Sequence, residues 1–188
     1  ELENSVAVKK KSAAIVLNAN PFTNGHLHLV ETAAAQTELL HLFVVSEDMS
    51  LIPSDDRFAL VRAGTAHLDN VMLHKTGSYL ISQATFPSYF FKEDRDVILT
   101  QAKLDTEIFK QIASALHIKT RFLGEEPFSL VTSIYNEVLL AELKKADIDC
   151  VVIPRKTQDG VAISASAVRA LIAKGEIENI IPLVPHST

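Results

Sequence analysis

The sequence contains one cysteine, Cys150, among 188 residues. A single cysteine excludes an intramolecular disulfide framework and any metal site built from a Cys-x-x-Cys pair. Such low cysteine usage fits a reducing compartment, so we expect a cytoplasmic protein. Cys150 opens a β-branched run, and we expect it to be buried as a small apolar side chain rather than to act as a nucleophile.

Long apolar runs and an excess of positive charge are also absent from the sequence. No run approaches the roughly 20 apolar residues that a membrane-spanning helix requires. The run AAIVL at 13–17 follows basic residues but is too short for a signal peptide. The formal net charge of −5 argues against a general nucleic-acid surface, although it is compatible with a local anion site.

Hydrophobic residues make up 47% of the chain, which is ample for one domain with a sizeable core. Apolar runs alternate with segments of helical periodicity. We expect strands at 13–18, 41–46, 71–74, 119–123 and 148–153, and helices at 25–37, 55–67, 96–116, 132–145 and 164–174. Strands separated by helices imply parallel βαβ units, so the predicted fold is α/β, a doubly wound Rossmann-like parallel sheet of about five strands.

Helix caps and one long connection complete the predicted organisation. We expect Ser54 or Asp55 to cap the second helix and Gly175 to end the last one. The irregular stretch at 75–93 is too long for an ordinary connection. We therefore expect a functional loop or lid there rather than a domain boundary.

An unusual turn, NANPFTNGH at 18–26, follows the first predicted strand. Ligands of open α/β sheets bind at the carboxyl ends of the strands, and a helix N-terminus there favours phosphate. Gly25 would let a ligand or the neighbouring backbone approach closely. His26 would donate to a phosphate oxygen and, when protonated, offset developing charge. The turn lacks the glycine patterns of dinucleotide sites and P-loops, and a surface histidine beside a shaping glycine is the alternative.

A second candidate anion site is ISASAVR at 163–169, after the last predicted strand. Ser164 can cap a helix there, and the N–H groups around Ser166 can face an anion. Arg169 lies one turn along the same face, and its guanidinium suits phosphate oxygens. An ordinary capped surface helix is the alternative.

The two segments together resemble a known pair of signatures. TNGH at 23–26 resembles the His/Thr-x-Gly-His signature of the HIGH nucleotidyltransferase superfamily, which includes phosphopantetheine and nicotinamide mononucleotide adenylyltransferases. ISASAVR resembles the second signature of the same superfamily, ISxTxxR or ISSSxxR/K, which begins a late helix. The joint resemblance implies an ATP-phosphate site shared by two helix N-termini.

Further segments resemble the citrate lyase ligase family: FVVSED, ATFPSYFFKEDRDV, RFLGEEPFS, TSIYNEVL and IPRK, over nearly all of 13–184. The resemblance implies an ATP-dependent acetate:SH-citrate lyase ligase. Acetate would attack the α-phosphate of ATP, giving acetyl-adenylate and pyrophosphate. The thiol of the phosphoribosyl-dephospho-CoA group on the acyl carrier subunit of citrate lyase would then take the acetyl group and release AMP.

The same resemblance implies a domain division, because family members carry an upstream acetyltransferase-like domain. Residues 1–12 are expected to be an N-terminal tail or a remnant of a linker to a missing upstream domain. Residues 13–188 are expected to form the nucleotidyltransferase-like catalytic domain. The first residue is not methionine, which fits a processed or truncated piece. Neither nucleic acid nor a membrane is an expected partner.

The resemblance also implies roles for individual residues. His26 and Thr23 are placed at the ATP phosphates, with His26 as the main transition-state stabiliser, and Arg169 completes the catalytic group. The expected cofactor-binding residues are Asn18, Asn20, Gly25, Gly124, Glu125, Arg155, Ile163, Ser164 and Ser166. Mg²⁺ is expected with ATP, held mostly by phosphates and water, and no protein metal ligand is predicted.

Three points stay open at this level. The segment at 82–92 is either the wall for acetate or the thiol arm, or a plain packed loop. The runner-up function is an adenylyltransferase of a small phosphate-bearing substrate, of the pantetheine or pyridine nucleotide type. A non-enzymatic nucleotide sensor of the same fold is the third hypothesis.

Overall fold

The expected strands form one parallel sheet in the computed structural model, which describes residues 11–89, 94–126 and 129–188. The strands are β1 (Ser12–Leu17), β2 (Leu39–Val44), β3 (Val71–Lys75), β4 (Ile118–Gly124) and β5 (Asp149–Ile153). Their spatial order is β3-β2-β1-β4-β5, and every pairing is parallel. The winding therefore reverses between β1 and β4, which confirms the doubly wound sheet and places its switch point there.

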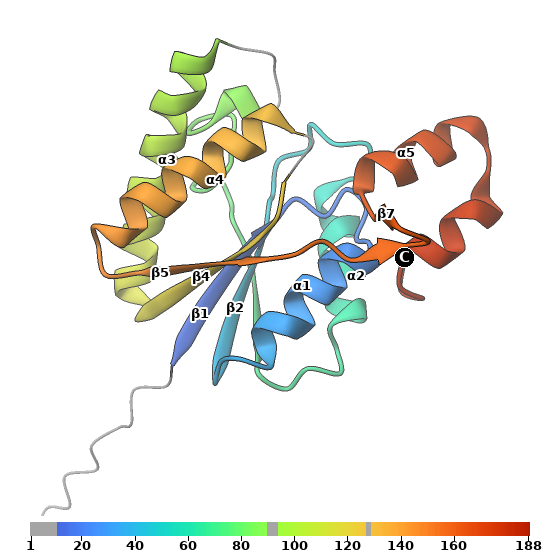
Figure 1. Cartoon of the computed structure of the whole chain (residues 1–188), viewed down its shortest axis with the longest axis horizontal. Coiled ribbons are helices and arrows are strands. Elements are labelled where there is room, and N and C mark those ends of the chain that lie inside the picture. The colour runs from blue at the N-terminus through green and yellow to red at the C-terminus, as the bar shows by residue number, and fades with distance from the viewer. Residues whose placement is uncertain (1–10, 90–93, 127–128) are drawn as a thin grey trace, which may run out of the picture.

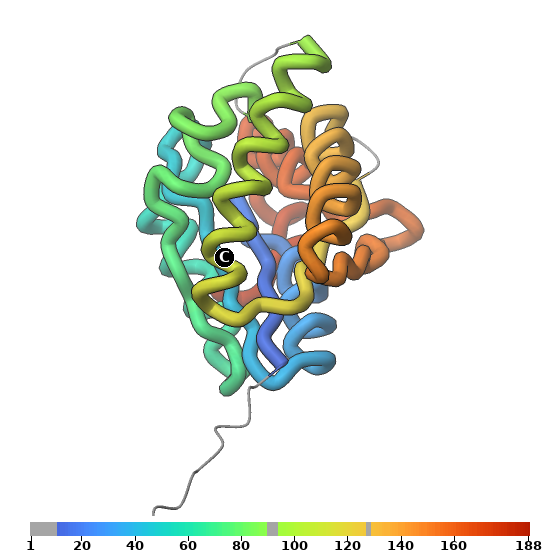
Figure 2. Tube along the Cα trace, turned by 90° about the vertical axis from the view of Figure 1, so that its left-hand side faces the viewer, coloured from blue at the N-terminus to red at the C-terminus, as the bar shows by residue number. Residues whose placement is uncertain are grey.

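Helices cover both faces of this sheet (Figure 1). One face carries α1 (Asn24–Ala34) and α2 (Ser54–Gly64), and the other carries α3 (Arg95–Ala115) and α4 (Leu130–Lys144). Figure 2 shows α3 and α4 running side by side over their face. The last helix, α5 (Ala165–Lys174), lies beyond the end of β5 and is followed by the 3-10 segment η2 (Ile177–Leu183).

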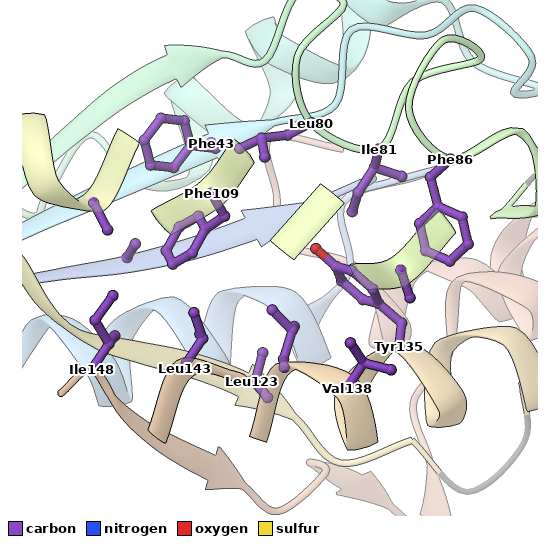
Figure 3. Close-up of a cluster of buried hydrophobic side chains, with 14 of the residues drawn as sticks. Phe43, Leu80, Ile81, Phe86, Phe109, Leu123, Tyr135, Val138, Leu143 and Ile148 are labelled. Atoms are coloured by element: carbon purple, nitrogen blue, oxygen red, sulfur yellow. The ribbon is translucent and has the colours of Figure 1, made fainter. Parts of the chain in front are cut away.

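The core divides into two apolar layers because side chains alternate along each strand. In β1, Ala13, Ile15 and Leu17 point to the α1–α2 side, whereas Ala14 and Val16 point to the α3–α4 side. Figure 3 shows the second layer, in which side chains of β2, β4, α3 and α4 interdigitate. Burial of each large apolar side chain contributes about 1.5–3 kcal/mol, so the two layers fix the strand ends that carry the site.

Helix boundaries agree with the predictions to within three residues, but the predicted cap of α2 differs. The N-cap of α2 is Pro53 and makes no side-chain cap bond, so the expectation of a Ser54 or Asp55 cap is wrong. The Ser54 amide instead donates to Asp48 Oδ1 at 2.5 Å, so a residue further back supplies the acceptor. Gly175 ends α5 in the left-handed region with φ 73°, as predicted.

A short hairpin between β5 and α5 was not predicted. It consists of β6 (Thr157–Gln158) and β7 (Val161–Ala162), which pair antiparallel. Asp159 and Gly160 form its turn, with φ values of 51° and 78°. Asp-Gly is the usual sequence for two positive φ angles in a hairpin turn, so the signal was present in the sequence.

The long connection between β3 and α3 is packed against the core. Leu80, Phe86 and Ser88 are buried, and η1 (Pro87–Tyr89) forms a single turn within it. Residues 90–92 of the predicted wall lie outside the described residues. So do residues 1–10 of the predicted tail, and β1 begins one residue before the expected boundary at 13. Within the described ranges, no helix has the length and apolar character needed to cross a membrane.

Candidate active site

A cleft of about 680 Å³ opens at the carboxyl ends of β1, β4 and β5, beside the starts of α1 and α5. This volume suits a small-molecule ligand. Every residue predicted for the site lines it: Asn18, Asn20, Thr23, Gly25, His26, Gly124, Glu125, Arg155, Ile163, Ser164, Ser166 and Arg169. The fold therefore brings the two sequence motifs to one place, from opposite ends of the chain.

Arg57 of α2 fixes the turn that follows β1. Its guanidinium is fully buried and donates to Asn18 O at 2.7 Å, Asn18 Oδ1 at 2.6 Å and Ile52 O at 3.0 Å. A guanidinium has no acceptor, so the carboxamide oxygen of Asn18 must face it. The Asn18 NH₂ group consequently turns away from Arg57, and it can donate to a ligand in the cleft.

Asn20 connects the first motif to the second. Its Oδ1 accepts from the Ile52 amide at 3.2 Å, and its carbonyl oxygen accepts from Arg169 Nη1 at 2.6 Å. Arg169 Nη2 also donates to Ser166 Oγ at 3.0 Å. The guanidinium of Arg169 is thus held between the start of α5 and the turn after β1. Asn20, expected to bind the cofactor, thus has a structural role in joining the two motifs.

His26 and Thr23 form a reciprocal cap at the start of α1. The Thr23 hydroxyl accepts from the His26 amide at 3.3 Å, while His26 Nδ1 accepts from the Thr23 amide at 3.0 Å. The imidazole takes the place that a Glu or Gln side chain has in an ordinary capping box. Because Nδ1 accepts a backbone N–H, the ring proton of the neutral imidazole is assigned to Nε2.

The surroundings of His26 decide whether its imidazole is protonated, the condition for it to offset developing charge. Burial, with a smaller contribution from the positive charge of Arg155, lowers the pKa of His26 from 6.5 to about 4. The imidazole is therefore neutral near pH 7. It can act on a ligand as a hydrogen-bond donor through Nε2–H, but it carries no positive charge of its own.

Gly25 lets two backbone segments approach. A Cβ atom at this position would lie 3.2 Å from the carbonyl oxygen of Ile163 and 3.5 Å from Thr23 Oγ1. Of the two interpretations left open by the sequence, the structure shows the approach of the neighbouring backbone. The first turn of α1 and the residue that precedes the α5 cap are therefore in direct contact.

Ser164 caps α5 as predicted. Its Oγ accepts from the Ala167 amide at 3.1 Å. The amides of Ala165 and Ser166 have no carbonyl within the helix to bond, because they belong to its first turn. They lie at the rim of the cleft together with the positive end of the helix dipole.

Arg155 joins the end of β5 to the end of β4. Its Nη2 pairs with Glu126 Oε2 at 2.7 Å, and its Nε donates to the carbonyl oxygen of Glu125 at 2.8 Å. Its Nη1 donates to Ile163 O at 3.4 Å. Arg155 lines the cleft, and its bond to Ile163 also holds the segment that leads to α5.

A family model for the citrate lyase ligase C-terminal domain matches residues 12–188. The chain belongs to the citrate lyase ligase C-terminal domain family. It is similar to citrate (pro-3S)-lyase ligase of Escherichia coli strain K12, at 44% identity over 184 residues, with 95% of this chain and 52% of the relative covered. The relative of the same name from Klebsiella pneumoniae is 42% identical over 184 residues, with 95% and 54% covered. The chain thus spans about half the length of these curated relatives.

A solved structure shows the same fold outside the citrate lyase ligase family. Pantoate-β-alanine ligase from Francisella tularensis, complexed with β-γ ATP and β-alanine, superposes with a TM-score of 0.57 at 16% identity. The match covers 95% of this chain and 72% of that one. At this level of identity, the likeness concerns the fold alone.

Two arginines of this citrate lyase ligase domain were missed by sequence reasoning. Arg57 lies inside an amphipathic helix, where nothing distinguishes it from a surface arginine. Arg121 lies in the β4 segment KTRFL and lines the cleft. It shares its strand face with Leu123, which belongs to the core, so the alternation of β4 was an available signal.

The described part of the chain contains no cluster of metal-binding side chains. No cluster there of three or more His, Cys, Asp or Glu side chains could hold an ion. Cys150 was expected to be buried, but it is half-buried in β5, packed against the core, and burial raises the pKa of its thiol.

Proposed function

We propose that this domain uses ATP to activate acetate as acetyl-adenylate and then acetylates the thiol of the citrate lyase prosthetic group. The observation that carries the proposal is the meeting of two helix N-termini at one cleft, held together by the contact between Arg169 and Asn20. Two such termini favour a polyanion. Membership of the citrate lyase ligase C-terminal domain family favours this activity over the adenylyltransferase alternative.

The α-phosphate of ATP would lie at the start of α1. The Nε2–H of His26 and the NH₂ group of Asn18 are the donors assigned to it. Both are held by contacts on their other side, His26 by Thr23 and Asn18 by Arg57. Donors that are positioned in advance stabilise a developing charge without reorganising during the reaction.

The leaving pyrophosphate would lie at the start of α5. Ser164 holds the cap, the amides of Ala165 and Ser166 face the β- and γ-phosphates, and Arg169 supplies positive charge. Mg²⁺ would accompany the phosphates and be held mainly by them and by water. Gly124 and Glu125 at the end of β4, with Arg155 beside them, would take the adenosine part.

Two displacements make up the proposed reaction. One carboxylate oxygen of acetate attacks the α-phosphorus, the bond between the α-phosphorus and the bridging oxygen to the β-phosphate breaks, and pyrophosphate leaves. The sulfur of the phosphoribosyl-dephospho-CoA group on the acyl carrier subunit then attacks the acetyl carbon. The thiol proton is released, the bond to the AMP oxygen breaks, and AMP leaves. Positioning and charge stabilisation account for most of the catalysis in such transfers.

The test is acetate-dependent exchange of labelled pyrophosphate into ATP by this chain. Hydroxylamine in the same mixture should trap acetyl hydroxamate, and omission of acetate should abolish both signals. Pyrophosphate release with 4′-phosphopantetheine or a pyridine mononucleotide in place of acetate would support the adenylyltransferase instead. ATP binding without exchange, with any carboxylate, would support the nucleotide sensor.

A further inference from the structure

The deep wall of the cleft contains a buried arginine that the reaction scheme above does not use. Arg121 of β4 is 2% exposed and lines the cleft on the face of the sheet covered by α3 and α4. Its guanidinium carbon lies 4.4 Å from the ring centroid of Phe109, so an aromatic ring covers one face of the cation. In the register of the sheet, Arg121 pairs with Ala14 of β1, the strand that ends at Asn18.

The Arg121 guanidinium interacts with the Tyr135 hydroxyl, but two of its nitrogen atoms lack a partner. Its Nε and Nη1 atoms are buried and have no hydrogen-bond acceptor among the described residues. Within the same part of the chain, no carboxylate lies within ion-pair distance of it, whereas Arg155 has such a partner in Glu126. An arginine stays protonated even when it is buried, and a buried charge is costly unless an opposite charge accompanies it.

The carboxylate that interacts electrostatically with Arg121 is committed to other donors. Asp105 of α3 is buried and accepts from the Ile81 amide at 2.6 Å, from Thr85 Oγ1 at 3.2 Å and from the Tyr135 hydroxyl at 2.7 Å. Figure 3 shows the Tyr135 hydroxyl pointing inward from α4. Because that hydroxyl donates its proton to Asp105, its oxygen can only accept from a further group. Arg121 bonds the Tyr135 hydroxyl, and its Nε and Nη1 atoms remain as donors for a ligand.

The surroundings of Arg121 limit the size of such a ligand. Val16, Ile81 and Leu123 line the same part of the cleft, and each is apolar. Ile81 is fixed by the hydrogen bond of its amide to Asp105, so this wall is anchored to the core. A guanidinium among short apolar side chains suits a carboxylate that carries a small alkyl group.

We propose that Arg121 anchors the carboxylate of the acid substrate, a short monocarboxylate, on the side of the sheet opposite α1. The inference rests on the proposed function and names the subsite of the second substrate. The guanidinium holds one carboxylate oxygen and leaves the other directed at the α-phosphorus. It also offsets the repulsion between the incoming carboxylate and the ATP phosphates. Asp105 acts as a positioning residue, because it does not line the cleft and it orients the Tyr135 hydroxyl beside Arg121.

The kinetic test compares Arg121→Met with the control Lys119→Met, which removes an exposed cation from the same strand. The KM for acetate in pyrophosphate exchange should rise about 10- to 100-fold in the Arg121 variant, the effect of losing one or two charged hydrogen bonds. The affinity for ATP, measured by calorimetry, should not change, and the control should behave as the wild type. An unchanged KM for acetate in a folded Arg121→Met protein would overturn the proposal.

A second measurement needs neither catalysis nor a folded methionine variant. The spectrum of wild-type protein with ¹⁵N-labelled arginine is compared with that of Arg121→Lys. The Nε–H signal that the variant lacks is the signal of Arg121. Sodium acetate should shift that signal, and sodium chloride at the same concentration should not. Exchange activity without any acetate-dependent shift would refute the subsite alone. A shift without exchange would refute the proposed function and leave the carboxylate site standing.

Discussion

The Nη1 atom of Arg169 lies 2.6 Å from the carbonyl oxygen of Asn20, although 149 residues separate them in the sequence. This contact joins the start of α5 to the turn after β1. Both positions belong to segments that were singled out for phosphate binding. The spacing between the two helix N-termini is therefore part of the folded structure before any ligand arrives.

Replacement of Arg169 by alanine should reduce kcat/KM for ATP by about 10²-fold, the order of effect seen when one charge-stabilising donor is lost. The variant loses both the contact with Asn20 and the positive charge intended for the leaving pyrophosphate. Steady-state pyrophosphate exchange at varied ATP measures the effect. The control is Lys174→Ala in the last turn of the same helix. Equal rates for the two variants would remove Arg169 from the mechanism.

Replacement of His26 by alanine should lower kcat by about 10²-fold or more, since it deletes the donor assigned to the α-phosphate. It should also destabilise the protein by about 1 kcal/mol, because the reciprocal cap with Thr23 is broken. His28→Ala, two residues along α1, is the matched control. Single-turnover rates separate the chemical loss from the stability loss seen in urea unfolding. A near-wild-type rate for His26→Ala would contradict the assignment.

The pH dependence of activity should show no titration of His26 near pH 6.5. With a pKa of about 4, the free enzyme keeps the imidazole neutral between pH 5.5 and pH 8. The profile of kcat/KM for ATP, measured with excess Mg²⁺, should therefore be independent of His26 over this range. A decrease centred near pH 6.5 in the wild type, absent from His26→Gln, would show that the imidazole is not held neutral.

The same pKa predicts a contribution of His26 to stability. The unfolded chain, with the ordinary value of 6.5, binds a proton more readily than the folded state does. The contribution is complete above about pH 6.5 and is lost as the pH falls towards 4. Urea midpoints for the wild type should accordingly fall more steeply over this range than those of His26→Gln. Parallel curves for the two proteins would contradict the lowered pKa.

Replacement of Arg57 by lysine should lower the free energy of unfolding by about 3 kcal/mol, because buried carbonyl groups lose their donors. It should also raise the KM for ATP, since Asn18 is no longer held with its NH₂ group towards the cleft. Arg62→Lys, an exposed position on the same helix, provides the comparison. Loss of stability with an unchanged KM would show that Asn18 does not depend on Arg57 for its role.

The sequence predicts this structure best where one local pattern decides the outcome. Apolar alternation and helical periodicity located the strands and long helices, and Ser164 is a cap because its side chain bonds a nearby amide. The predicted cap of α2 was wrong because Asp48, which lies outside the helix, accepts from the Ser54 amide. Arg57 was not predicted because its acceptors, among them Asn18, lie outside its own helix. For Arg121, the apolar alternation of β4 was a signal that the prediction did not use.

The close approach of Gly25 to the backbone of Ile163 affects which substitutions this domain can accept at the two positions. The atom opposite Gly25 is the main-chain oxygen of Ile163, so the separation of the two helix ends does not depend on which side chain residue 163 carries. Substitutions at 163 can alter the walls of the cleft while the distance between the start of α1 and the start of α5 stays constant. A side chain at position 25 would change that distance. The walls of the cleft and the spacing of the two helix starts can therefore vary independently. The side chain of residue 163 affects the walls, whereas residue 25 affects the spacing.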